Sequence, residues 1–243
     1  MKIGILTAVW QRPKVTRIFA EGIKRLQKKF DITPVVVGSE GEASMSLCRE
    51  YGFMYLERPN EPLGRKFNEG LQVFKSTDVD YVIIMGSDDL VSDNLIEAYM
   101  PYMEKGKDMM GILDVYFYDM LKKELHYLYG YGLRKQDRHR KGETLGMARC
   151  IKRSVIERCR WQLWMNSINK GLDWTMTQKL KRMRVRTVAL RLTGIGAFAV
   201  DLKSGNNICG LNIYRTTIVD DSIMSLLSDK ELKMIRDYVR DET

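Results

Sequence analysis

The stretch that most constrains this chain is residues 81–90, YVIIMGSDDL, an apolar run that ends in two adjacent carboxylates. A short apolar run rich in β-branched residues predicts a buried central strand, and the following GSDD predicts the turn at its carboxyl end. An open α/β sheet binds its ligands at that end. Two neighbouring carboxylates repel each other, and their hard oxygens suit Mg²⁺ or Mn²⁺. The alternative is that Asp88 or Asp89 caps a helix beginning near Ser92.

Strand and helix patterns alternate through the first hundred residues. We expect strands over residues 2–9, 33–37, 53–56 and 81–85, and helices over residues 15–26, 43–51, 65–74 and 92–103. This alternation implies right-handed crossovers and a mostly parallel sheet.

The pattern changes after Met103. Tyr and Phe are frequent in the next segments, which predicts an antiparallel ribbon. We expect strands over 109–118, 125–129 and 185–192, a charged loop over 134–143, a partly helical 148–158, and helices over 171–183 and 228–240. With no repeat and no low-complexity linker, residues 1–243 are expected to form one α/β domain.

Composition excludes several classes of protein. No apolar run approaches the roughly 20 residues that span a bilayer, and the apolar start is too short for a signal peptide, so we expect a cytoplasmic protein. The four Cys and two His are scattered without metal-ligand or disulfide spacing, which argues against a zinc site or a Cys–His nucleophile.

Positive charge is concentrated in one segment. Residues 134–191 hold 17 Lys and Arg against 4 Asp and Glu, a net charge of +13, whereas the rest of the chain has 23 basic and 27 acidic residues. Such asymmetry favours a polyanionic partner, either nucleic acid or an anionic membrane surface. Solvated helix faces are the alternative explanation.

The ordered set of polar segments resembles the nucleotide-binding half of glycosyltransferases with the GT-A fold, especially family 2. The segments are TAVWQRP (7–13), VGSEGE (37–42), ERPNEPLGRKFNEGL (57–71) and GSDD (86–89). The similarity covers residues 1–103 well and the remainder loosely. It implies a GT-A-like fold with a Rossmann-like half (1–103) that binds a nucleotide sugar, and a smaller antiparallel half (104–243) that binds the acceptor.

The resemblance also implies a donor site for a nucleotide-diphosphate sugar, expected to be a UDP-sugar. Asp89 would be the direct ligand of Mn²⁺ or Mg²⁺, with Asp88 directed at the ribose or at the water shell of the metal. The base pocket would be lined by Thr7, Ala8, Trp10 and Glu40, and the phosphates would meet Arg12, Arg65 and Lys66. For Arg65 and Lys66 the alternative is an exposed helix start.

A late loop is the second part of the implied donor site. Related transferases return such a loop over the diphosphate and often complete the metal shell there. Asp201 or Asn207 would supply the further ligand, and Lys203 with Ser204 would hold phosphate. A plain surface turn over residues 204–207 is the alternative.

Asp173 is the expected catalytic base. Related enzymes place an acidic pair at the start of a helix after the antiparallel portion, and here Leu172 replaces the first member of that pair. The alternative is that Asp173 caps the helix. Trp174 beside it would stack on a sugar or a base, or belong to the core.

These observations predict a metal-dependent glycosyltransferase. The basic segment and the aromatic residues near it favour a hydroxymethylated base in DNA as the acceptor, as in phage enzymes that act in the host cytoplasm. Alternatives are a cell-surface or lipid-linked glycan as acceptor, a sugar nucleotidyltransferase, and a non-catalytic nucleic-acid-binding module. The oligomeric state is left open.

Overall fold

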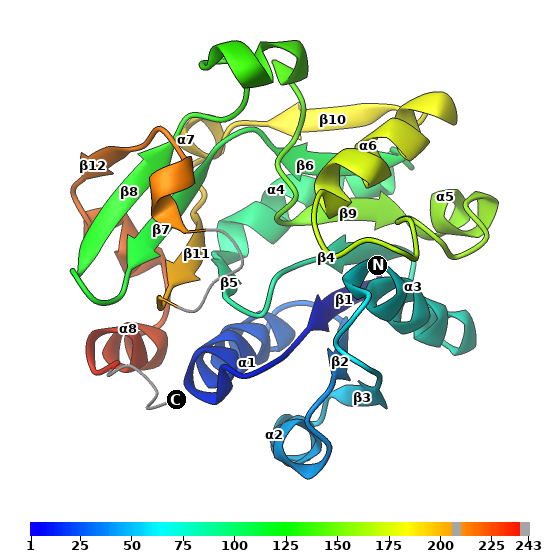
Figure 1. Ribbon diagram of the computed structural model, residues 1–243, viewed down its shortest axis with the longest axis horizontal. Coiled ribbons are helices and arrows are strands. Elements are labelled where there is room, and N and C mark those ends of the chain that lie inside the picture. Colours follow the sequence, from blue (N-terminus) through cyan, green and yellow to red (C-terminus); the bar gives the residue numbers. More distant parts are fainter. Residues whose placement is uncertain (206–209, 239–243) are drawn as a thin grey trace.

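The computed structural model describes residues 1–205 and 210–238, and this part of the chain forms two β-sheets with helices packed around them (Figure 1). The larger, central sheet contains β1 (Ile3–Ala8), β2 (Ile32–Gly38), β3 (Met54–Glu57), β4 (Tyr81–Ile84), β6 (Met109–Ile112), β9 (Arg149–Lys152) and β10 (Thr187–Leu190). Their order across the described sheet is β10-β6-β9-β4-β1-β2-β3.

Strands β1 and β4 form the middle of this sheet. They pair in parallel with Leu6 opposite Ile84, so both end at the same edge. β1 also pairs in parallel with β2, and all four residues of β4 are buried. This near-continuous apolar character is what a parallel strand covered on both faces requires.

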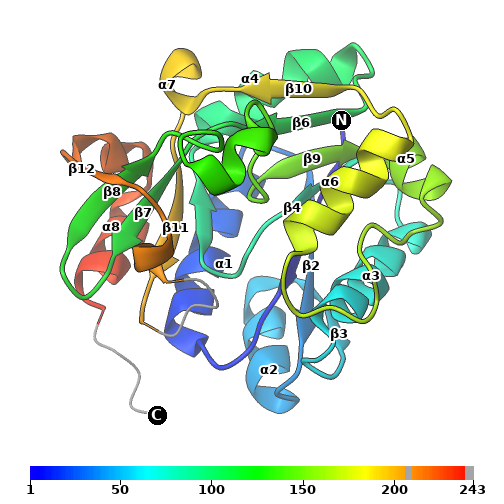
Figure 2. The same cartoon turned by 45° about the horizontal axis from the view of Figure 1, so that its top comes forward.

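Helices cover both faces of the central sheet. The helices are α1 (Pro13–Gln27), α2 (Glu42–Tyr51), α3 (Leu63–Val73), α4 (Asp93–Glu104), α5 (Arg153–Arg158), α6 (Leu172–Arg182), α7 (Leu192–Ile195) and α8 (Asp229–Arg236). Side chains of α1, α2 and α4 pack with Ile5 and Ile83 in one core cluster. Those of α3, α5 and α6 pack with Leu6 and Ile84 in a second cluster on the opposite face (Figure 2). The alternation of side chains along β1 and β4 produces this division.

A smaller sheet lies beside the central one. Its strands are β5 (Asp89–Val91), β7 (Val115–Asp119), β8 (Glu124–Leu128), β11 (Ala199–Lys203) and β12 (Thr217–Val219). Their order is β12-β8-β7-β11-β5, and every pair except β7 with β11 is antiparallel. Short 3₁₀ turns complete the described elements, namely η1 (Phe74–Ser76), η2 (Lys135–Arg140), η3 (Leu211–Ile213) and η4 (Ser222–Leu226).

The fold is mixed α/β with a mostly parallel central sheet, as predicted, but one predicted segment was wrong. The strand expected over 109–118 is broken, with β6 in the central sheet and β7 in the smaller one. Asp114 lies at the break, fully buried, and its carboxylate accepts hydrogen bonds from Leu192 N at 2.8 Å and Tyr127 Oη at 2.7 Å. The break therefore serves to connect the two sheets.

The segment 148–158 is partly helical, as expected, but its first part is a strand that the sequence analysis did not predict. It begins as β9, which is antiparallel to both β4 and β6, and becomes helical only in α5. The apolar pair Cys150 and Ile151 is fully buried inside the sheet, and this burial outweighs the helical periodicity.

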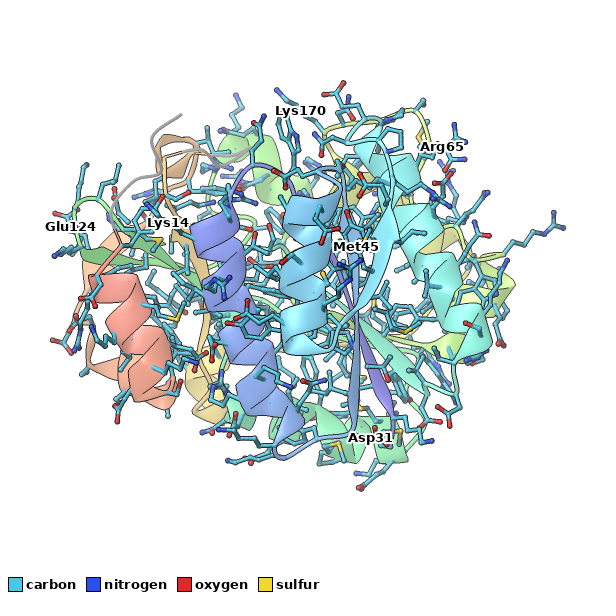
Figure 3. The ribbon with its side chains drawn as sticks, turned by 90° about the horizontal axis from the view of Figure 1, so that it is seen from below. Lys14, Asp31, Met45, Arg65, Glu124 and Lys170 are labelled. Atoms are coloured by element: carbon cyan, nitrogen blue, oxygen red, sulfur yellow. The ribbon has the colours of Figure 1, made fainter. Side chains whose placement is uncertain are left out.

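Labelled charged residues mark the two opposite edges of the central sheet, where its strands begin and end. Lys14 and Arg65, in the first turns of α1 and α3, lie at one edge together with Lys170, and Asp31, just before β2, lies at the other (Figure 3). The edge with Lys14 is the one where β1 and β2 end. None of the helices among residues 1–205 and 210–238 combines the length and the apolar character that crossing a bilayer requires.

Candidate active site

Three carboxylates meet where the central sheet joins the smaller one. Oxygens of Asp88, Asp89 and Asp201 all lie within 4.8 Å of one another. Asp88 lies in the turn after β4, and Asp89 begins β5. The register of β5 with β11 places Asp201 directly opposite Asp89, so their side chains lie on the same face. We call these three residues the acidic cluster.

The helix-cap alternative for Asp88 and Asp89 is wrong. The residue that precedes the first turn of α4 is Ser92. Its hydroxyl accepts a hydrogen bond from Phe198 N at 2.9 Å. The backbone of these residues is instead held by β11, since Leu202 N donates to the backbone carbonyl oxygen of Asp88 at 2.8 Å and Asp89 pairs with Asp201.

The acidic cluster concentrates negative charge in a buried place. Burial, and then the charges of Asp88 and Asp201, raise the pKa of Asp89 well above its ordinary value. Burial and Asp88 likewise raise the pKa of Asp201 to about 7, although Lys203 opposes the shift. Asp201 Oδ1 is buried and has no hydrogen-bond partner in the described part of the chain. A set of hard oxygens with one unsatisfied atom suits a divalent cation.

Two of the expected phosphate-binding cations lie against the acidic cluster. Arg12 Nη1 is 2.6 Å from Asp88 Oδ2, and its Nη2 donates to Ser87 Oγ at 2.9 Å. Lys203 Nζ is 2.6 Å from Asp201 Oδ2, and its side chain is almost fully buried. Burial lowers the pKa of Arg12, but the neighbouring carboxylates outweigh it and raise the pKa overall. Both cations therefore balance part of the cluster's charge.

Lys66 points into the protein and joins the ends of the first strands. Its Nζ donates to Val9 O at 2.8 Å, Ser39 Oγ at 2.7 Å and Asn60 Oδ1 at 3.2 Å. Burial lowers the pKa of Lys66 to about 8, while Glu40 raises it. The exposed-helix-start alternative is therefore wrong for Lys66.

Arg65 points the other way and is exposed. Its Nε lies 2.9 Å from Glu69 Oε1, one turn further along α3. It lines a pocket of about 420 Å³ whose other residues are Pro62, Asn68, Glu69, Gln72, Gln162, Asn166 and Ser167. Among residues 1–205 and 210–238, Arg65 makes no hydrogen bond or ion pair with the acidic cluster.

The residues expected to line a base pocket lie at strand ends. Thr7 is buried at the end of β1, and its Oγ1 has no hydrogen-bond partner among the described residues. Ala8 follows it, and the Trp10 side chain is 45% exposed. Glu40, after β2, accepts a hydrogen bond from Ser44 Oγ at 3.0 Å. Of the late-loop residues, Ser204 is buried beyond β11, and Asn207 lies outside the described residues.

Asp173 is the second residue of α6 and does not cap it. The capping position is Gly171, in a left-handed conformation with φ 73°, and no side chain caps the helix. The Asp173 carboxylate packs on the Cα of Gly146, where an added Cβ would lie only 2.0 Å from Oδ1. Gly146 comes three residues before Arg149, which pairs with Ile84 at the end of β4. Asp173 therefore lies at the same edge of the sheet as the turn that carries Asp88.

A fully buried arginine supports this helix start and was missed by the sequence analysis. Arg149 donates to Leu145 O at 2.7 Å, Thr144 O at 2.7 Å and Asp173 O at 3.2 Å. Burial lowers the pKa of its guanidinium, and the nearby charge of Asp173 opposes that shift. The only signal in the sequence was an arginine directly before the apolar pair Cys150 and Ile151.

The charged loop over residues 134–143 contacts α6, the helix that carries Asp173. The guanidinium carbon of Arg140 lies 5.5 Å from the ring centroid of Trp174, and the His139 ring meets Trp174 edge-on at 5.4 Å. From α6, Lys181 Nζ pairs with Glu143 at 2.5 Å. The loop expected over 134–143 is thus partly the 3₁₀ turn η2, packed beside Asp173.

Solved structures with a similar fold include both glycosyltransferases and nucleotidyltransferases. Residues 1–349 of TarS from S. aureus are 12% identical, with a TM-score of 0.55 over 78% of this chain and 58% of that one. The inositol-1-phosphate CTP transferase from T. maritima is 10% identical, with a TM-score of 0.54 over 97% of this chain and 95% of that one. Glucosyl-3-phosphoglycerate synthase from Mycobacterium tuberculosis is 10% identical, with a TM-score of 0.51 over 79% and 69%. At these identities the likeness shows the fold alone.

Comparison of the sequence with protein families adds what the likeness in fold does not show. No curated protein matches the chain. The pattern of the family described as "Glycosyl transferase family 2" matches residues 10–160, which is more than half of the chain and includes Arg12, Lys66, Asp88 and Asp89. The chain therefore belongs to glycosyl transferase family 2 and has the GT-A type of fold.

Proposed function

We propose that the protein is a metal-dependent glycosyltransferase that moves a sugar from a nucleotide-diphosphate donor to an acceptor hydroxyl. The observation that carries this proposal is the acidic cluster with its unsatisfied Asp201 oxygen, located at the same sheet edge as Asp173. Family membership supports the reaction class. The structure of the M. tuberculosis synthase was solved with Mg²⁺ and UDP, which supports the same kind of donor here.

The acidic cluster is proposed to hold Mn²⁺ or Mg²⁺ through Asp89 and Asp201, with Asp88 completing the site. The bound ion would supply Lewis-acid stabilisation of the charge on the departing diphosphate. Arg12 and Lys203 are proposed to bind phosphate oxygens as well, because their guanidinium and ammonium groups lie beside the cluster. Asn207, outside the described residues, stays a proposed further ligand.

The base of the donor is proposed to bind at the strand ends. Thr7 and Ala8 would form the floor, and Trp10 is exposed enough to stack on the ring. Glu40 and Lys66 lie beside this place, where Lys66 fixes the backbone of Val9. We propose a UDP-sugar as donor and residues 1–103 as the half that binds it.

Asp173 is proposed to be the general base. Its carboxylate would accept the proton of the acceptor hydroxyl as that oxygen bonds to the anomeric carbon and the bond to the diphosphate breaks. The contact with the Cα of Gly146 restricts the position of the carboxylate, and Arg149 donates a hydrogen bond to the backbone carbonyl of Asp173. Residues 104–243 are the half proposed to bind the acceptor.

The proposed acceptor is a hydroxymethylated base in DNA. Arg138 and Lys141 are exposed in the segment that packs beside Asp173, and they form no ion pair within residues 1–205 and 210–238. Lys170 lies at the edge where β1 ends (Figure 3). Cations so close to the base suit a phosphate backbone. Such an enzyme would act in the cytoplasm, the host's if a phage encodes it.

A donor and acceptor panel tests the proposal. We expect release of nucleoside diphosphate from a UDP-sugar in the presence of Mn²⁺, faster with hydroxymethylated than with plain DNA, and none with Asp89→Asn. Asp31→Asn, at the opposite edge of the sheet, is the matched control. Release of pyrophosphate from a nucleoside triphosphate instead would identify a nucleotidyltransferase, a reading disfavoured by the absence of glycine from residues 7–13.

Salt dependence identifies the acceptor class. With DNA as acceptor, the logarithm of affinity should fall linearly with the logarithm of salt concentration, with a slope near −0.9 per phosphate contacted in duplex DNA. An affinity that does not change with salt would rule out DNA and favour an uncharged glycan.

A further inference from the structure

Three planar groups from separate segments form a column beside the proposed base. The Arg140 guanidinium carbon lies 3.6 Å from the ring centroid of Tyr131 and 5.5 Å from that of Trp174. Tyr131 follows β8, Arg140 ends η2, and Trp174 lies in the first turn of α6. The three residues thus bring distant parts of the chain together, and we call them the stacking column.

The stacking column is held in place by charged contacts. Arg140 Nε donates to Glu143 Oε2 at 2.7 Å, and the other oxygen of that carboxylate accepts from Lys181 on α6 at 2.5 Å. The side chain of Glu143 is only 6% exposed. Because Lys181 and Trp174 belong to the same helix, Arg140 cannot move away from Trp174 without breaking this bridge.

Two features of the column are not used within the protein. Trp174 is 38% exposed, so part of its ring is open to a ligand. Arg140 Nη2 is buried and has no hydrogen-bond partner in the described part of the chain. Because this nitrogen is covered, the exposed Trp174 ring is the part of the column that is available to a ligand.

The column lies against Asp173. Trp174 is its neighbour in the chain, and Tyr131 is close enough that, after burial, the charge of Asp173 is the next cause that raises the pKa of the phenol. A ring stacked on Trp174 would therefore lie in the neighbourhood of the Asp173 carboxylate. This is the place that the hydroxyl of an acceptor must occupy.

We propose that the stacking column is the acceptor subsite, in which a nucleobase of single-stranded or extruded nucleic acid stacks on the exposed part of the Trp174 ring while Arg140 holds that ring in place. This inference rests on the proposed function, which it deepens by naming how the acceptor is held. Aromatic rings and guanidinium planes bind unstacked bases in this way. The exposed cations Arg138 and Lys141 in the same segment favour a nucleic acid over a sugar ring as the ligand.

Binding and kinetics test this subsite separately. Trp174→Ala should weaken binding of a labelled single-stranded oligonucleotide, measured by fluorescence anisotropy, by ~5- to 100-fold. The same variant should raise the KM for a hydroxymethylated acceptor by a similar factor without changing the KM for the donor. Trp174→Phe, which keeps a ring, should recover most of both losses. Arg140→Lys, which keeps the charge but loses the planar group, should behave like Trp174→Ala.

Tyr129 provides a matched control outside the column. It is 51% exposed and carries the guanidinium of Arg191 at 3.9 Å from its ring centroid, so Tyr129→Ala removes a similar stack. We expect that variant to bind the oligonucleotide and turn over like the parent.

Parent-like binding by Trp174→Ala would overturn the subsite, as would equal loss in Trp174→Phe and Trp174→Ala. The proposed function fails by a different result, the absence of Mn²⁺-dependent donor turnover in the parent. The anisotropy measurement still decides the subsite in that case, because it needs no turnover.

Discussion

Replacing Asp201 with asparagine should stabilise the metal-free protein and remove its response to Mn²⁺. Burial and the charge of Asp88 raise the pKa of Asp201 to about 7. Near neutral pH, ionising this carboxyl therefore costs more free energy in the folded than in the unfolded protein. A carboxyl with an ordinary pKa near 4 that titrates near 7 when folded costs on the order of 4 kcal/mol at pH 7 and above. The side chain is 20% exposed and loses its contact with Lys203 in the variant, so we expect a net gain of about 2 kcal/mol.

Thermal unfolding in EDTA and in Mn²⁺ measures both effects. For a chain of this size a gain of about 2 kcal/mol raises Tm by roughly 4 to 8 °C. The parent should gain a further ~2.7 kcal/mol at a Mn²⁺ concentration 100 times the Kd, and Asp201→Asn should gain almost none. Asp31→Asn, at the opposite edge of the sheet, should match the parent in both conditions.

The stability of the metal-free protein should fall as the pH rises. The folded pKa of Asp201 lies above its unfolded value, so the unfolded state releases the proton first and stability is lost as the pH rises from about 4 to 7. In EDTA the parent should therefore approach the stability of Asp201→Asn as the pH falls from 7.5 toward 5. A variant that melts below the parent in EDTA, or that Mn²⁺ stabilises equally, would refute the reasoning.

Three further predictions concern groups outside the acidic cluster. Because the pKa of Lys66 is lowered to about 8, the unfolded state binds more protons above pH 7, and the urea-derived free energy of unfolding should gain ~1 kcal/mol between pH 7 and 9, a gain that Lys66→Met abolishes. Arg149→Met removes the arginine's hydrogen bonds to the buried carbonyls of Thr144 and Leu145 and to that of Asp173, so the variant should lose about 2 to 4 kcal/mol by urea denaturation. Its pH–rate profile should be displaced if Arg149 positions Asp173, and an unchanged profile would assign it a structural role alone. Glu231, fully buried on α8, accepts from Arg25 Nε at 2.8 Å, so Glu231→Leu should lose about 3 to 5 kcal/mol by chemical denaturation and Lys230→Leu, on the same helix, far less.

Much of the central sheet could be predicted because its strands carry their own signal. The apolar runs of β1 and β4 are each buried on both faces, and no distant contact is needed to recognise them. Strand β5 could not be predicted in this way. It has three residues, and its partner β11 lies about 110 residues further along the sequence.

The candidate site shows the same division. Asp88 and Asp89 were found from the end of an apolar run, and Asp201 was named only through the family resemblance. Arg149 was missed because its three partners are backbone carbonyls, which no residue type encodes. The direction of Lys66 was also beyond the sequence, since neighbouring residues of a helix start can point inward or outward.

The position of β11 between β5 and β7 has a consequence for synthesis of the protein. Asp88 and Asp89 leave the ribosome long before Asp201, and the matched family pattern, residues 10–160, is complete while the opposing strand is still untranslated. The nascent chain can thus bury its parallel core early without gathering three repelling carboxylates. The ability to bind an ion, and with it any unproductive hydrolysis of activated sugars, would arise only after β11 has been synthesised.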